Sequence, residues 1–249
     1  MVSTRHHPGD FPAPATPNLA QKTETEQDGR VDTREWRHTP SVIVTIWLSI
    51  SVPLVLWDAG YVLFRPHSMP GGRLHFIWKP YALYGTIDYI YGWPAWHNRN
   101  GFTSAQSLMN LVETACYLFY LFVLFKYGTT PNIKGHRKSK SAKKSGFLVP
   151  RKSIGGWLGA TALLVVFSGS VMTVSKTLLY ALNEVCSGFD NVGHNSFWTL
   201  IFLWIIPNGL WIVVPSYASC YFGKEIVNAI IQPPSGPSDT NDDLKLKSR

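Results

Sequence analysis

The stretch SAQSLMNLVETACYLFYLFVLF, residues 104–125, decides the fold class of this chain. Apart from Glu113 it contains no charged residue, and its second half is almost entirely aromatic or aliphatic. About 20 such residues in a helix cross the hydrocarbon core of a bilayer. The stretch therefore predicts a membrane-spanning helix that carries one carboxyl group.

Three further stretches have the same character, at residues 41–64, 154–183 and 196–222. Charged residues make up only 15% of the 249 residues, against about 25% in ordinary soluble domains. We therefore expect an all-α membrane protein, a four-transmembrane-helix bundle that occupies residues 41–231. A soluble globular protein is excluded by the same composition.

The distribution of basic residues predicts how the bundle is oriented. Residues 126–152 contain nine Lys and Arg and no acid, whereas residues 184–195 contain no Lys or Arg. Since loops rich in Lys and Arg stay in the cytosol, the first of these loops is expected there. Four spans then place the tails, 1–40 and 232–249, in the cytosol as well, and their polar composition indicates disorder. The Trp- and Tyr-rich segment 65–103 becomes a luminal lid.

Three polar side chains inside the predicted spans, Asp58, Glu113 and Asn208, lie in the same half of the bundle when their depth is counted along each span. Ionisable groups at membrane depth are candidate functional groups. A neutral carboxyl in an apolar cavity can donate a proton, and a second, ionised carboxyl can accept one. The alternative is that these residues only form hydrogen bonds between helices. Lys176 is expected to reach the luminal surface by extending its aliphatic stem.

The tryptophans near these positions are Trp57, Trp204 and Trp211, whose ring faces could stabilise a developing carbocation. Packing or anchoring at the membrane interface is the alternative for each ring. Other chemistry is not indicated. The three cysteines share no metal-ligand spacing, and phosphate-binding or hydrolase motifs are absent from the sequence. No metal, cofactor or nucleic-acid partner is expected.

Four short motifs together resemble the EXPERA superfamily, which includes the emopamil-binding protein, a sterol Δ8–Δ7 isomerase, and the sigma-2 receptor. These motifs are Asn208-Gly-Leu-Trp211 followed by an apolar run and Pro215, Val112-Glu113-Thr114, Leu178–Glu184 continuing to His194, and Trp78-Lys79-x-Tyr81. Their order and their placement on the predicted spans match the family's pattern. The resemblance covers residues 41–229.

The resemblance implies a role for several residues. Glu113 takes the place of the membrane glutamate of proton transfer, and Asn208 and Trp211 take the places of the cavity asparagine and cation-stabilising tryptophan. Asp58 falls where the isomerase has a glutamate, but Leu54 stands where the isomerase has a histidine. Two further acids, Glu184 and Asp88, lie in segments that resemble the family's loops.

Two functions follow as alternatives. The first is an isomerase that shifts a carbon–carbon double bond, or directs a related carbocation rearrangement, in a sterol- or terpenoid-like substrate. The second is a non-catalytic sterol- or lipid-binding protein. The expected partners are that lipophilic substrate, membrane lipids and, as an alternative to a monomer, a second copy of the chain. The resemblance implies the endoplasmic reticulum membrane.

Overall fold

The computed structural model describes residues 36–130 and 152–231, and the features below refer to these residues. Its main elements are four long helices: α1 (Val42–Leu63), α4 (Phe102–Tyr127), α5 (Gly156–Cys186) and a continuous fourth helix, Phe197–Ile231. Each is long and apolar enough to cross a membrane. The prediction of a helical bundle with four such helices is confirmed, and the fourth continues nine residues beyond the expected Phe222.

The fourth helix changes its winding near its beginning. It consists of α6 (Phe197–Leu200), a π-helical turn η3 (Ile201–Ile205) and α7 (Ile206–Ile231). Pro207 lies two residues after the end of the π-helical turn. A proline has no N–H to donate and clashes with the preceding turn of an α-helix. A π-helical turn accommodates such a residue without ending the helix. Asn208 follows this proline in the first turn of α7.

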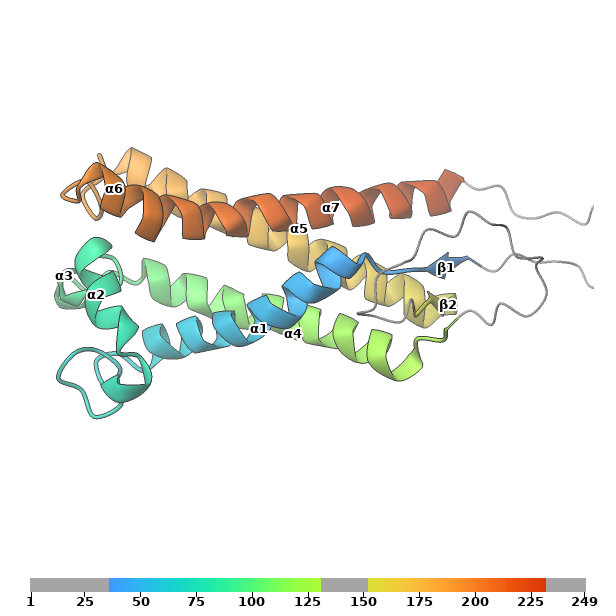
Figure 1. Cartoon of the computed structure of the whole chain (residues 1–249), viewed down its shortest axis with the longest axis horizontal. Helices are drawn as coiled ribbons and strands as arrows, with labels where there is room; N and C mark the ends of the chain where they lie inside the picture. Colours follow the sequence, from blue (N-terminus) through green and yellow to red (C-terminus); the bar gives the residue numbers. More distant parts are fainter. Residues whose placement is uncertain (1–35, 131–151, 232–249) are drawn as a thin grey trace, which may run out of the picture. The chain divides into compact units, whose positions relative to one another are not determined.

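Short helices link α1 to α4 and cover one end of the bundle (Figure 1). They are the 3₁₀ turn η2 (His75–Ile77), α2 (Pro80–Ile87) and α3 (Trp93–His97). Proline at the first or second position begins both α2 and α3, where a missing N–H removes no helical hydrogen bond. The segment expected as an aromatic loop therefore contains three short helices that are joined by turns.

At the opposite end, a two-stranded antiparallel sheet joins the beginning of the chain to α5. Strand β1 (Arg37–His38) pairs with β2 (Ile154–Gly155). His38 is fully buried, and its two ring nitrogens lie 2.8 Å from Glu225 Oε1 and Tyr120 Oη. The prediction of a disordered tail is therefore wrong for residues 36–40, which belong to the folded part that the structure describes. The predictions for the rest of both tails and for residues 131–151 lie outside the described residues.

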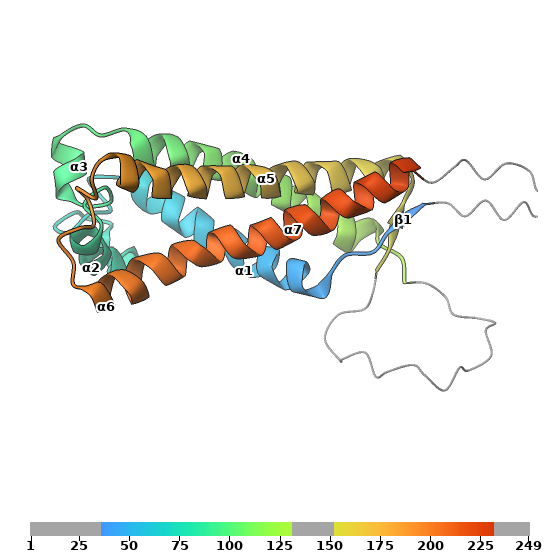
Figure 2. The same cartoon turned by 90° about the horizontal axis from the view of Figure 1, so that it is seen from above.

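The four helices pack in the order α1, α4, α5 and α7, and α1 and α7 make much less contact than the other neighbouring pairs (Figures 1 and 2). The core of the bundle contains Leu48, Tyr120, Val166 and Phe222, one from each helix. Gly169 allows α5 to approach α4 closely, because a Cβ at this position would lie 3.1 Å from the Tyr117 ring. The weakly packed side between α1 and α7 is where the candidate site lies.

Candidate functional site

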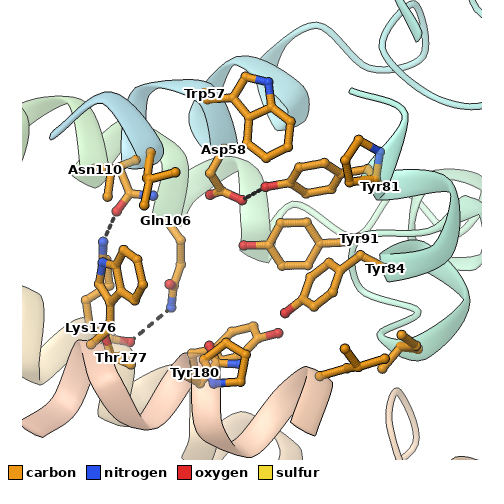
Figure 3. A pocket seen from close by; sticks show the side chains of 18 of the residues that line it. Trp57, Asp58, Tyr81, Tyr84, Tyr91, Gln106, Asn110, Lys176, Thr177 and Tyr180 are labelled. Atoms are coloured by element: carbon orange, nitrogen blue, oxygen red, sulfur yellow. Dashed lines mark hydrogen bonds between the residues drawn. The ribbon is translucent and has the colours of Figure 1, made fainter. Parts of the chain in front are cut away.

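A cavity of about 490 Å³ lies between α1, α2, α4, α5 and the fourth helix. This size is typical of small-molecule sites in proteins. Its wall is formed by Leu54, Val55, Trp57, Asp58, Pro80, Tyr81, Leu83, Tyr84, Ile87, Tyr91, Gln106, Asn110, Lys176, Thr177, Tyr180, Leu203, Pro207, Asn208 and Trp211. Figure 3 shows tyrosines on one side and amide and ammonium groups on the other. A largely apolar wall with a few polar groups fits a lipophilic molecule.

Asp58 faces this cavity from α1, and the Tyr81 hydroxyl of α2 donates a hydrogen bond to its Oδ1 (Figure 3). The neighbouring Trp57 joins α1 to the 3₁₀ turn η2 by hydrogen bonds. Its indole N–H donates to the Ile77 carbonyl over 3.2 Å, and the Trp78 indole donates to the Trp57 carbonyl over 2.7 Å. These reciprocal bonds hold the Asp58–Tyr81 pair in place at the cavity wall.

Three further tyrosines surround this pair. The Tyr61 ring stacks on Tyr81 with centroids 4.0 Å apart, and its hydroxyl donates to the Tyr91 carbonyl over 2.9 Å. Burial raises the pKa of the Tyr84 and Tyr91 hydroxyls well above that of an exposed tyrosine. Both hydroxyls therefore stay protonated at neutral pH and act as neutral hydrogen-bond donors in the cavity.

Asn208 and Trp211 both line the cavity from α7, one helical turn apart. The Asn208 amide donates to the Trp204 carbonyl over 2.8 Å, and its oxygen remains as an acceptor. The Trp211 ring meets Trp47 of α1 edge-to-face, with centroids 5.1 Å apart. This contact bridges α1 and α7. Both residues therefore line the cavity, and the roles that the sequence hypothesis gave them stay a prediction.

Glu113 does not line the large cavity. Both of its carboxylate oxygens lie 3.2 Å from the Lys176 ammonium, and one accepts a 2.8 Å hydrogen bond from the Thr173 hydroxyl. Glu113 borders instead a void of about 10 Å³ that Trp211 also lines. Lys176 is 6% exposed, so it does not extend to a surface as the sequence indicated. It forms a buried ion pair at the edge of the large cavity.

Asp88 is fully buried behind the cavity wall. Its Oδ2 accepts hydrogen bonds from the Tyr180 hydroxyl and, over 3.0 Å, from the Trp204 indole, and its Oδ1 accepts one from the Ile90 amide over 3.1 Å. Burial raises the pKa of Asp88 to about 6, although these hydrogen bonds oppose the shift. Trp204 therefore anchors a carboxyl group and does not itself line the cavity.

Glu184 lies at the end of α5 and is also fully buried, away from the cavity wall. Its Oε1 accepts hydrogen bonds from the amides of Asn191, over 2.8 Å, and Asn183, over 3.2 Å. These bonds fix the turn that leads from α5 into the fourth helix. Of the two additional acids, Glu184 thus contacts its own connecting segment and Asp88 contacts a cavity residue.

Arg65 connects the segments that carry these groups. It is 7% exposed, and its guanidinium donates to the Ile90 carbonyl over 3.3 Å and to the Thr103 hydroxyl over 2.8 Å. The end of α1, the turn after α2 and the beginning of α4 are thereby joined. Sequence reasoning did not select Arg65, since it lies just outside the apolar stretch.

No protein-family model, curated protein or solved structure matches this chain. Within residues 36–130 and 152–231, no group of three or more His, Cys, Asp or Glu side chains could hold a metal ion. The functional interpretation therefore rests on the cavity and on the residues in its wall.

Sequence reasoning also missed several polar cavity residues. Gln106 and Asn110 lie seven and three residues before Glu113, so all three lie on one face of α4. Lys176 and Tyr180 lie four residues apart and therefore on one face of α5. This periodicity of polar residues inside two apolar stretches was the signal that would have identified the wall of the site.

Proposed function

We propose that this chain is a membrane-embedded isomerase that shifts a carbon–carbon double bond in a sterol- or terpenoid-like substrate. The observation that carries the proposal is the Asp58–Tyr81 pair, which faces an aromatic cavity in the bundle. Ionisable groups at such depth are typically functional. The resemblance of the Asn208–Trp211 and Glu113 motifs to the EXPERA superfamily supports the same class of reaction.

The chemistry requires one carboxyl group that faces the ligand. In its neutral form Asp58 donates its proton to one alkene carbon, which breaks the π bond and leaves a carbocation on the other carbon. The Tyr81 hydroxyl stabilises the resulting carboxylate, and the faces of Trp57 and Trp211 stabilise the cation. The carboxylate then removes a proton from the carbon adjacent to the cation. The double bond has moved, and Asp58 is neutral again.

This assignment gives Asp58 the role that the sequence hypothesis gave mainly to Glu113. The geometry favours Asp58, because Asp58 lines the large cavity whereas Glu113 is paired with Lys176 behind it. We further propose that the α2–α3 end of the bundle faces the lumen of the endoplasmic reticulum and that the β1–β2 end faces the cytosol. The charge pattern of the sequence supports this orientation.

The experiment begins with the protein in lipid nanodiscs and the lipid that copurifies with it, identified by mass spectrometry. Incubation of this lipid in deuterated water should yield an isomer with one new deuterium, because the Asp58 proton exchanges with water. Asp58→Asn should lower the rate by about 10²–10⁴-fold, as expected for loss of a general acid. Asp190→Asn, at an exposed acid in a connecting turn, is the matched control and should leave the rate unchanged.

The second candidate function is non-catalytic binding of a sterol-like lipid. The Lys176–Glu113 ion pair favours it, since this pair leaves one carboxyl group facing the cavity where two were expected. A binding protein would retain the lipid at about one molecule per chain and incorporate no deuterium. That result, obtained with a correctly folded protein, would exclude the isomerase and establish the second candidate.

A further inference from the structure

The side of the cavity opposite the tyrosines carries hydrogen-bond donors. Gln106 and Asn110 of α4 and Lys176 of α5 form it, and we call these three residues the donor wall (Figure 3). The Tyr81 and Tyr84 side lies across the cavity. The proton-transfer chemistry proposed above uses Asp58 and does not use the donor wall. Its three polar side chains therefore require a separate explanation.

The Lys176 ammonium has three N–H groups and, among the described residues, two side-chain partners. The Asn110 oxygen accepts one hydrogen bond, and the Glu113 carboxylate lies 3.2 Å away. Lys176 is more than nine-tenths buried and also lines the cavity. Its third N–H is therefore available to an acceptor inside the cavity.

The two amides add further donors. Because an ammonium group can only donate, the Asn110 oxygen must face Lys176, and the Asn110 nitrogen points away from it (Figure 3). Gln106 donates one N–H to the Lys176 carbonyl over 3.3 Å, which leaves its second N–H unassigned. The donor wall thus offers several N–H groups, and an apolar ligand would leave them without acceptors at the cavity surface.

We propose that the donor wall binds a neutral oxygen, a ketone or hydroxyl group, of the lipophilic ligand. The charge balance excludes an anion, since the Glu113 carboxylate already compensates the ammonium of Lys176. The ligand would then be an oxygenated polycyclic lipid with its oxygen at α4 and α5. This inference rests on the proposed function only in that the cavity holds a lipophilic molecule, and it requires no turnover.

The test uses three rigid saturated probes of the same shape: 5α-androstane, 5α-androstan-3β-ol and 5α-androstan-3-one. Each is supplied in tritiated form to the full chain in nanodiscs, and affinity is expressed per mole fraction of probe in the bilayer. A hydrogen bond to a charged donor should make the ketone and the alcohol bind about 10- to 100-fold more tightly than the hydrocarbon.

The variant that removes the ammonium is Lys176→Met combined with Glu113→Gln, so that no unpaired charge remains buried. In this double variant the ketone and the hydrocarbon should bind within about threefold of each other, while the hydrocarbon keeps its native affinity. Gln106→Leu, at a half-buried position, should lower the preference partially. Tyr127→Phe, at the exposed end of α4, removes a hydroxyl outside the cavity and should leave the preference unchanged.

Equal affinities of the three probes for the native chain would overturn the inference, as would the absence of binding by all three. A preference that persists in the double variant would also overturn it. These results are independent of the deuterium experiment, since saturated probes cannot isomerise. A chain that prefers the ketone but incorporates no deuterium would be a binding protein with an oxygen site.

Discussion

The buried ion pair between Lys176 and Glu113 gives the sharpest stability prediction. Both side chains are almost completely buried, and each provides most of the charge compensation of the other. Removal of one partner from such a pair typically destabilises a protein by about 3–5 kcal/mol. We therefore expect Lys176→Met and Glu113→Gln to be strongly destabilising when introduced singly.

The size of each effect is limited by neutralisation of the remaining group. At pH 7, protonation of a glutamate that has its reference pKa costs about 3.7 kcal/mol. Deprotonation of a lysine that has its reference pKa costs about 4.6 kcal/mol. The destabilisation by each single variant cannot exceed these values, because a buried unpaired group changes its protonation instead of staying charged. At pH 5 the ceiling for the remaining carboxyl falls to about 1 kcal/mol. At pH 9 the ceiling for the remaining ammonium falls to about 2 kcal/mol.

The two single variants should consequently respond to pH in opposite directions. Lys176→Met should approach the native stability as the pH is lowered from 7 to 5, whereas Glu113→Gln should approach it as the pH is raised from 7 to 9. The double variant should be more stable than either single variant at pH 7, because no charge remains buried.

Unfolding by titration of mixed micelles with denaturing detergent, followed by circular dichroism at pH 5, 7 and 9, measures these free energies. The native chain at each pH is the reference, so that titration of other groups cancels. Parallel pH profiles of the two single variants would refute the reasoning. Additive effects in the double variant would refute it as well, since they would show that the two groups do not interact.

Three other predictions follow from the same structure. An amphiphilic amine should bind in the cavity against Asp58, and Asp58→Asn should weaken it at least about tenfold in a radioligand assay; unchanged affinity would place the amine elsewhere. The native state holds the Asp88 proton up to a pKa of about 6, above the usual 3.8, so stability falls as pH rises through this window. The stability of Asp88→Asn relative to the native chain should therefore rise by up to about 3 kcal/mol between pH 4 and 7.5 in thermal unfolding, and a constant difference would contradict this. In a cysteine-free background, an impermeant thiol reagent applied from the luminal side should label a cysteine at Asn98 and spare one at Thr130, and the reverse pattern would invert the proposed orientation.

The positions of the four long helices could be predicted from the sequence because hydrophobic length is a local property. The ends of these helices were predicted less accurately. The fourth helix continues past Pro207 and Pro215 to Ile231, since the π-helical turn accommodates the first proline without ending the helix. Residues Arg37 and His38 look like part of a polar tail, yet they pair with a strand that lies more than 100 residues away in the chain.

The candidate site was predictable only in part. Asp58 and Asn208, which were selected by their depth in the predicted spans, line the cavity, and so do Trp57 and Trp211, which were selected as ring faces near them. The partner of Glu113 was not predictable in the same way, because depth along one helix does not say which helix faces it. The pairing with Lys176 depends on the packing of α4 against α5, which is a tertiary property.

The cavity lies on the side of the bundle where two helices can separate most easily. α1 and α7 share few contacts, and Trp47 and Trp211 supply the edge-to-face contact between them. Leu54 and Leu203 are exposed apolar residues of the cavity wall on the two sides of this seam. A lipophilic molecule entering from the hydrocarbon region therefore meets apolar side chains first. Separation of α1 from α7 would break the tryptophan contact and leave the hydrogen bonds between α4 and α5 intact. In the proposed binding mode, the donor wall and the Lys176–Glu113 pair would thus keep their positions while the ligand enters, and such preorganisation favours recognition of a weakly polar molecule.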